Sequence, residues 1–277
     1  PFLFQNLGES SFGLINLSLS IFILLSIIIS YGYHLNGPKH ISLITQINKE
    51  KDLINELISI RIFLALIVSL LIILIIHFSS LFDGYSIIVL FSIPILWSEA
   101  IHPVFYLQGK NNLFILAILN SFSKLIYLAF IILFIKSEED AYKVNLMLGM
   151  SLFIVYLFFW IKIYLKNKIE FVWSSFEKLI YRLKENFEFF FSSIAGHIST
   201  HSGLIILKLF VDNLELGKFA LANRIALLLR MVPVFIVQSV LQNATLISKE
   251  NNSGLKEYLN YYYWRGLVIT FIIGLFF

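Results

Sequence analysis

The sequence predicts an all-α protein that crosses a membrane several times. Hydrophobic residues make up 58% of the chain and charged residues only 14%, whereas an ordinary soluble domain has about 25% charged residues. A helix needs about 20 consecutive apolar residues to cross the hydrocarbon core of a bilayer, and seven stretches of the chain meet that requirement. The 28 Phe and 13 Tyr residues also suit contact with lipid and anchoring at its interface.

The predicted membrane helices follow one another through short links. They are expected at 13–35, 60–82, 85–107, 113–135, 144–165, 187–210 and 219–247. Residues 1–5 are interpreted as the end of an earlier helix, and a further helix is expected to begin near residue 261. We therefore expect the chain to be an internal fragment of a longer membrane protein. The short links leave no room for a soluble catalytic domain.

The distribution of Lys and Arg predicts the orientation of these helices. Most of these residues lie in loops on one face, and Arg61 is counted among them, in the loop before the second helix. Because positively charged loops stay on the cytoplasmic side of a membrane, that face is expected to be cytoplasmic. The segments expected to face outward are those around 1–12, 83, 136–143 and 211–218.

The longest cytoplasmic link, 166–186, has an amphipathic pattern. Its apolar residues recur at helical spacing, and they are Ile169, Val172, Trp173, Phe176, Leu179, Ile180 and Leu183. We favour a helix that lies in the inner membrane interface, because Trp and Phe face one way and the basic residues the other. The alternative interpretation is a solvated connector.

Two segments of the chain resemble each other at an offset of 207 residues. Residues 6–16 and 213–223 share five identities in eleven positions, and both are expected to be outward turns between two membrane helices. An even number of helices between the copies would give them the same orientation. This arrangement indicates two parallel repeats about an axis along the membrane normal, which is a known plan among transporters. The alternative is chance similarity between sequences at a membrane edge.

The stretch AGHISTHSGLIILK carries three nitrogen bases on an otherwise apolar helix. His197, His201 and Lys208 fall on one stripe of that helix, since each residue turns the helix by about 100°. A zinc-protease motif would need a Glu directly after the first His, and this position is Ile198. We therefore expect no metal site and favour bases that line a cavity. A pair of packed or hydrogen-bonded histidines is the alternative.

Other ionisable residues also lie within the predicted helices, where they usually face a bundle interior or an aqueous cavity. Lys124 lies near the middle of its helix, and Glu99 lies one turn before His102. Arg224 shares a face with two glutamines of its own helix, whereas Arg230 lies on another face and is expected to pair with Glu99. An interior of this kind, with mainly basic groups, would suit an anionic head group. Lys208 and Arg224 have an alternative role, in which they extend to the membrane interface.

Several short motifs, in a consistent order along the chain, carry a family resemblance. They include Leu7-Gly8 followed by Phe12-Gly13, then Tyr31-Gly32, then the segment Pro103 to Lys110 with Gln108-Gly109, then the segment 183–193, and finally Leu216-Gly217 followed by Arg224. The chain resembles the O-antigen and polysaccharide flippases (Wzx type) of the polysaccharide biosynthesis protein family, within the multidrug/oligosaccharidyl-lipid/polysaccharide transporter superfamily. Phe105 stands where that family usually has Trp, and Arg224 stands near its usual Lys.

The resemblance implies a MATE-like bundle of about twelve membrane helices in two lobes. In this chain, 1–165 would form the N-terminal lobe (the end of helix 1 and helices 2–6). Residues 166–186 would link the lobes, and 187–277 would begin the C-terminal lobe with helices 7–8 and part of helix 9. The implied activity is the movement of undecaprenyl-diphosphate-linked oligosaccharides across the bacterial inner membrane by alternating access, with no enzymatic reaction and no cofactor. Membrane lipid, an O-antigen polymerase and a chain-length regulator are the implied partners, and nucleic acid is not.

In that function, Lys124, Lys208, Arg224 and Arg230 are expected to attract the anionic part of the substrate. His197, His201, Glu99 and His102 are expected to line the path, where the histidines would suit proton coupling because they titrate near neutral pH. A multidrug exporter of the same superfamily remains an alternative, but it would be expected to use buried acids. A membrane glycan enzyme, such as an O-antigen polymerase or acyltransferase, is a further alternative, and a polymerase would be expected to have a longer outward loop. A purely structural scaffold fits poorly with so many buried charges.

Overall fold

The computed structural model describes residues 2–44, 46–228, 260–266, 268 and 271. The chain divides into two compact units, Pro1–Lys218 and Phe219–Phe277. Most of the description below concerns the first unit. In the second unit the described residues 219–228 and 260–266 are helical.

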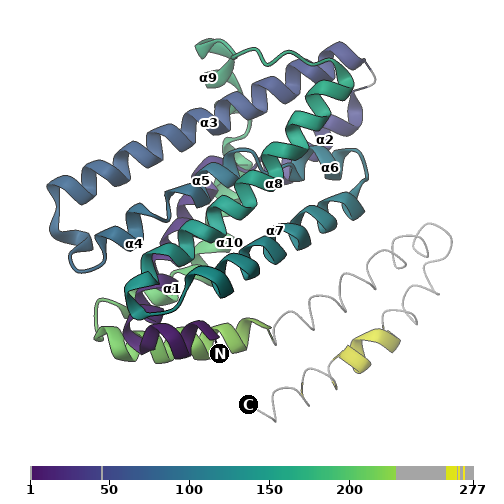
Figure 1. Ribbon diagram of the computed structural model, residues 1–277. Coiled ribbons are helices and arrows are strands. Elements are labelled where there is room, and N and C mark those ends of the chain that lie inside the picture. The colour runs from purple at the N-terminus through teal and green to yellow at the C-terminus, as the bar shows by residue number, and fades with distance from the viewer. Residues whose placement is uncertain (1, 45, 229–259, 267, 269–270, 272–277) are drawn as a thin grey trace. The chain divides into compact units, whose positions relative to one another are not determined.

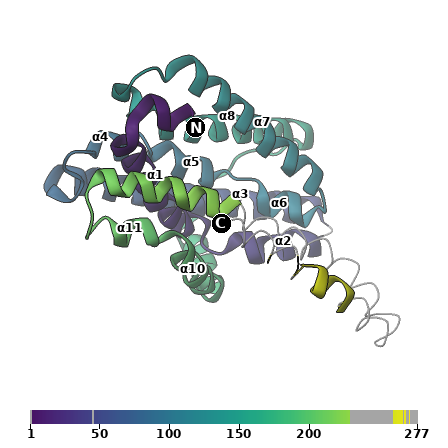
Figure 2. The same cartoon turned by 90° about the horizontal axis from the view of Figure 1, so that it is seen from below.

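The described part of the chain is built from helices (Figure 1, Figure 2). The α-helices are α1 Phe2–Ser30, α2 Tyr33–Leu43, α3 Ile47–Phe78, α4 Ser86–Leu90, α5 Ile93–Ala100, α6 Val104–Gly109, α7 Leu113–Phe134, α8 Lys143–Asn167, α9 Phe176–Glu185, α10 Phe187–His201 and α11 Gly203–Leu207. Two short 3-10 helices, η1 Ser80–Phe82 and η2 Glu138–Tyr142, lie in turns, and residues 213–218 end the first unit in a helix.

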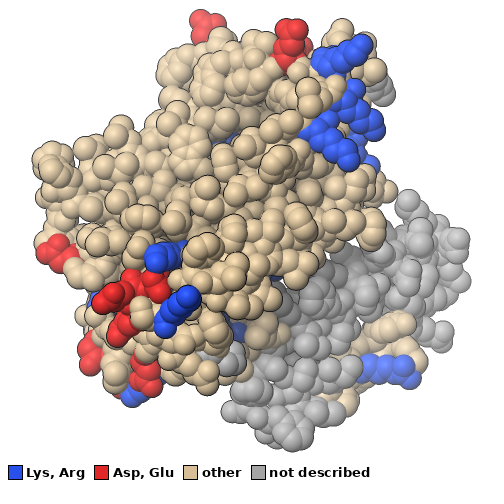
Figure 3. Space-filling model, viewed as in Figure 1, with Lys and Arg blue, Asp and Glu red and all other residues tan. Residues whose placement is uncertain are grey.

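Five helical segments among the described residues are long and apolar enough to cross a membrane. They are Phe2–Leu43, Ile47–Phe78, Ser86–Gly109, Leu113–Phe134 and Glu138–Asn167. On the face shown in Figure 3, charged side chains of the first unit gather near the ends of the helices, and the surface between them is nearly free of charge. The predicted class, an all-α polytopic membrane protein, is confirmed.

Segments that were predicted to share a side of the membrane lie together. On the predicted outward side, the Ser11 hydroxyl donates to Glu138 Oε1 at 2.8 Å, and the rings of Phe91 and Tyr142 lie 5.0 Å apart. On the predicted cytoplasmic side, Lys51 Nζ donates to the carbonyl of Lys168 at 3.0 Å. The helices therefore alternate in direction as the distribution of positive charge predicts.

The two similar segments of the sequence touch through one glycine each. A Cβ atom on Gly217 would lie 1.9 Å from the carbonyl oxygen of Glu9, and one on Gly13 would lie 2.7 Å from the amide nitrogen of Gly217. Both distances are far below any real Cβ contact, so the helices can approach this closely only because neither position carries a side chain. The contact joins α1 to the helix that begins at residue 213.

Three helix boundaries differ from the prediction. The first membrane helix begins at Phe2 and bends at Gly8, where φ is 73°. The second begins at Ile47, because the apolar pattern of α3 extends upstream of residue 60. This makes Arg61 a residue of the membrane helix, so its placement in a cytoplasmic loop was wrong. The third, predicted at 85–107, consists of the short helices α4, α5 and α6.

The predicted helix at 187–210 is also divided. It consists of α10 and α11, which meet at Ser202. The Thr200 hydroxyl near this junction donates to the carbonyl of Gly196 at 3.2 Å, and such a bond from a side chain to the preceding turn commonly bends a helix.

The link between α8 and α10 is helical only in its second half. Residues 169–175 lie outside any helix, and α9 follows them. Side chains of α3 satisfy part of the extended backbone, because Asn55 Nδ2 donates to the carbonyl of Glu170 and the amide of Ser174 donates to Ser59 Oγ. The prediction of one continuous amphipathic helix was therefore wrong for this half. Within α9, Leu179 is buried against the bundle.

Candidate functional site

A buried arginine occupies the inside of the first unit. Arg61 of α3 is 1% exposed, and its Nη2 lies 3.2 Å from Glu99 Oε1 of α5. Its guanidinium also lies over the ring of Phe105, 5.6 Å from the ring centre. A charge can remain in such an environment when a counter-ion and hydrogen bonds replace its water. Glu99 thus has Arg61 as its partner, and the predicted partner Arg230 lies outside the described residues.

Arg61 also satisfies backbone groups that a helix break exposes. Pro103 has no N–H, so the helix stops between α5 and α6 and leaves carbonyl groups without their usual donors. Arg61 Nη1 donates to the carbonyl of His102 at 2.9 Å, Nη2 donates to the carbonyl of Glu99, and Trp160 Nε1 of α8 donates to the carbonyl of Ile101 at 2.7 Å. Side chains from two other helices, α3 and α8, therefore hold the break in one conformation.

His102 lies at the same break and links it to α8. Its Nδ1 lies 3.9 Å from Glu99 Oε2, and its ring lies 4.9 Å from the ring of Tyr156. The Tyr156 hydroxyl in turn donates to Asn120 Oδ1 of α7 at 2.8 Å. The predicted association of Glu99 with His102 is present, within a polar network that crosses four helices.

The histidines of α10 meet a third histidine from α2. The ring centres of His197 and His201 lie 6.2 Å apart in a stacked arrangement, and those of His197 and His34 lie 6.3 Å apart, edge to face. His197 Nδ1 donates to the carbonyl of Ser193 at 2.9 Å, so the proton of the neutral ring is on Nδ1. Among the residues that the structure describes, no group of three or more His, Cys, Asp or Glu side chains could hold a metal ion.

Two of the four predicted cations, Lys208 and Lys124, lie in the first unit. Lys208 is half-buried and donates to Asn213 Oδ1, at the predicted outward end. Lys124 is exposed on α7, a helix whose apolar stretch is only 11% buried. Arg224 is exposed in the second unit, and Arg230 lies outside the described residues. Within the first unit, the predicted site residues thus comprise an internal network with Glu99 and His102, a pair of histidines, and the cations Lys124 and Lys208.

Sequence reasoning missed Arg61 and His34. Arg61 was assigned to a loop because it follows a basic segment, although the apolar period of α3 places it on the buried stripe with Ile54, Leu57 and Val68. His34 lies just after the Tyr31-Gly32 turn, near the end of the helix predicted at 13–35, and was not singled out as a site residue. No local signal in the sequence indicates its contact with α10, because that contact joins residues 163 positions apart.

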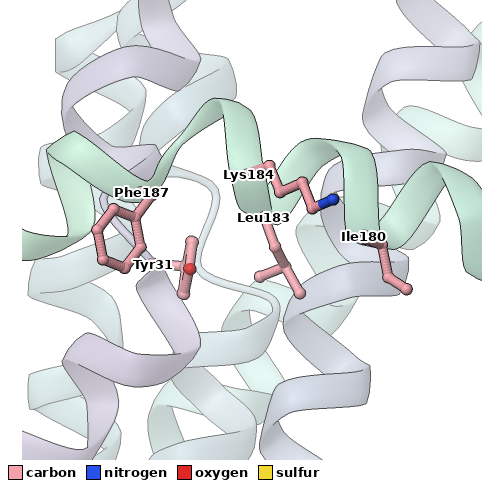
Figure 4. Close-up of a pocket in the computed structure, with 5 residues that line it drawn as sticks. All are labelled: Tyr31, Ile180, Leu183, Lys184 and Phe187. Atoms are coloured by element: carbon pink, nitrogen blue, oxygen red, sulfur yellow. The ribbon is translucent and has the colours of Figure 1, made fainter.

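A pocket lies at the predicted cytoplasmic end, where α9 meets the end of α1. Its volume is about 360 Å³, and the residues that line it are Tyr31, Ile180, Leu183, Lys184 and Phe187 (Figure 4). Apolar side chains dominate this lining, and Lys184 is its one basic residue. The pocket could thus accept an apolar group that carries a negative charge at its edge.

Comparison with known proteins agrees with this architecture. A family described as "Polysaccharide biosynthesis protein" matches residues 1–242. A relative from Shigella dysenteriae, named "Putative O-antigen transporter", is 24% identical over 253 residues, which cover 89% of this chain and 62% of that relative. The chain therefore spans less than two thirds of the relative's length. No solved structure matches the chain significantly. Because the family match covers most of its residues, the chain belongs to the polysaccharide biosynthesis protein family.

Proposed function

We propose that the protein is a flippase that moves undecaprenyl-diphosphate-linked oligosaccharides from the cytoplasmic to the periplasmic leaflet of the bacterial inner membrane. The observation that carries the proposal is the family match over residues 1–242, together with a relative named as an O-antigen transporter. The helical membrane architecture supports transport. The lipid-linked form of the substrate and the alternating access of two lobes are the further steps of the proposal.

The internal polar network and the histidines of α10 support a path for a charged head group. In the proposal, Lys124, Lys208, Arg224 and Arg230 attract the diphosphate or acidic sugars, because cations can replace the counter-ions that a phosphate has in water. His197 and His201 line the path, and Glu99 and His102 belong to the network that supports it. The proposed partners are an O-antigen polymerase and a chain-length regulator, which would use the units delivered outside.

The arrangement of Glu99 argues against the multidrug exporter. Binding of a cationic drug would need a buried acid that is available to the drug, and Glu99 has a fully buried arginine within 3.2 Å. A drug cation would have to compete with Arg61 for this carboxylate.

Replacing Arg224 tests whether the proposed cations attract the anionic part of the substrate. Arg224→Ala should abolish surface glycan in a strain that lacks its own flippase, while the amount of protein in the membrane stays normal. Lys218→Ala is the matched control, since Lys218 is exposed and pairs with Glu215 at 2.9 Å; it should leave glycan display unchanged. Wild-type display from Arg224→Ala would remove Arg224 from the mechanism.

A further inference from the structure

His34, His197 and His201 form a row of three rings where the two predicted lobes meet. The contact of α2, and of the turn before it, with α10 is called the joint. His34 belongs to α2, in the predicted N-terminal lobe, and His197 and His201 belong to α10, the first helix of the predicted C-terminal lobe. The contact between His34 and His197 is therefore made by two parts of the chain that alternating access would move relative to each other.

Uncharged contacts flank the histidines at this joint. Asn36 Nδ2 donates to Asn186 Oδ1 at 3.0 Å, and the rings of Tyr31 and Phe190 stack 4.3 Å apart. A Cβ atom on Gly32 would lie 2.6 Å from the carbonyl carbon of Phe189. Packing of this density leaves little freedom for a small adjustment. A repulsion between His34 and His197 would therefore favour separation of α2 from α10.

His197 is the titratable neighbour that faces His34 from α10. Glu99 and Arg61, which are paired with each other, also act electrostatically on His34. His102 is a further titratable neighbour. On the other side of the joint, His197 has His34 and His201 as its titratable neighbours.

His40 is a separate titratable group on α2, and it faces a different helix. Its Nε2 lies 3.8 Å from Glu185 Oε1 of α9, beside Arg182. A proton on His40 would strengthen its attraction to Glu185 and hence the contact between α2 and α9. His40 Nε2 also lies 2.9 Å from Asn36 Nδ2, and Asn36 in turn donates to Asn186 at the start of α10. His40 therefore needs its own substitution to separate its effect from that of His34 and His197.

We propose that His34 and His197 form a proton-binding latch between α2 and α10. The latch is closed, with α2 and α10 in contact, while the two histidines together hold at most one added proton. A second proton adds to the lone pair of the remaining basic ring nitrogen, which on His197 is Nε2, and the two imidazolium ions then repel each other across the joint. The role of this opening in transport rests on the proposed flippase function, but the latch itself does not.

Spin-label distance measurements test the latch without any substrate. The full-length protein in lipid nanodiscs would carry one label at Lys39→Cys on α2 and one at Glu188→Cys on α10, both exposed positions. This chain has no cysteine, and any cysteine elsewhere in the protein would be replaced by serine. The distance distribution should shift to longer values as the pH falls through the range from about 8 to 5, where histidine titrates.

Single substitutions identify which histidines cause the pH-dependent shift in the distance between the labels. His34→Gln and His197→Gln should each abolish the shift, whereas His77→Gln, at an exposed histidine at the far end of α3, should keep it. Loss of the shift in His40→Gln alone would assign it to the pair with Glu185 and overturn the proposal. A wild-type protein without a shift, or a shift that persists in both His34→Gln and His197→Gln, would also overturn it. Because no transport is measured, failure of the latch and failure of the flippase assignment are distinguishable.

Discussion

Arg61 and its partners explain how a charged side chain is accommodated deep within this bundle. Removing one partner of a buried ion pair leaves the other charge uncompensated, which typically costs about 3–5 kcal/mol. Arg61→Ala would leave the Glu99 carboxylate without its cation and two carbonyl groups without donors. We expect a large fall in the thermal unfolding temperature of the purified protein and in its membrane level.

Lys124→Ala is the matched control for that substitution. It removes a cation that is exposed on α7, and surface substitutions usually change stability by less than about 0.5 kcal/mol. If Arg61→Ala unfolds at the same temperature as Lys124→Ala, the buried network does not stabilise the bundle in the way described above.

The close contact of glycines between α1 and the helix that begins at residue 213 leads to a second prediction about stability. Gly217→Ala would place a methyl group 1.9 Å from the carbonyl oxygen of Glu9, so the helices must move apart. Overpacking of this kind typically costs about 1–3 kcal/mol. Gly203→Ala is the control, because a Cβ atom there has no neighbour within 4 Å. Equal unfolding temperatures for the two variants would contradict the contact.

At the scale of single residues, the sequence could predict which ionisable groups lie in membrane helices but not what they contact. Glu99 and His102 were placed together because they are one helical turn apart. The partner Arg61 comes from another helix, and its burial could have been inferred from the apolar period of α3. The contact between His34 and His197 depends on tertiary packing, for which a single sequence carries no signal.

At the scale of secondary-structure elements, α9 is held to α3 by charge. Glu56 of α3 lies 3.1 Å from Lys178 Nζ and 2.9 Å from Arg182 Nη2. Burial lowers the pKa of Arg182, but hydrogen bonds and charges from Glu185 and Glu56 more than offset this effect and raise it. Arg182 therefore stays charged at any physiological pH, and the docking of α9 should respond to salt rather than to pH.

Replacing Glu56 tests the docking of α9. Glu56→Gln should accelerate amide hydrogen exchange over 176–185, because the helix loses its main ionic contact with α3. Glu177→Gln, at an exposed position of α9 itself, should leave that exchange unchanged. An unchanged exchange rate in Glu56→Gln would show that the ionic contact with α3 does not hold the helix.

The predicted elements were most accurate where the apolar pattern is long, as in 113–135, which corresponds to α7 Leu113–Phe134. They were least accurate where side chains from other elements satisfy the backbone. The link before α9 has helical spacing, yet Asn55 and Ser59 provide hydrogen bonds that keep it extended. The break near Pro103 is stable because Arg61 and Trp160 cap its carbonyl groups. Such compensation by distant residues cannot be inferred from local sequence.

At the scale of the whole molecule, the fold class and the family could be predicted, and the arrangement of the site could not. The alternation of positive charge predicted which turns share one end of the bundle, as the contact of Ser11 with Glu138 shows. The similarity of 6–16 to 213–223 marks two segments that do touch, through Gly13 and Gly217. The two-lobe division and the inner-membrane location remain predictions.

The most direct test of the proposed function is the distribution of lipid-linked intermediates between the leaflets of a deletion strain. Without a flippase, the strain should accumulate complete undecaprenyl-diphosphate-linked units on the cytoplasmic leaflet, and little glycan should reach the surface. Reintroduction of the gene should return these units to the normal distribution. Accumulation of single units on the outer side would instead indicate a polymerase and would contradict the account.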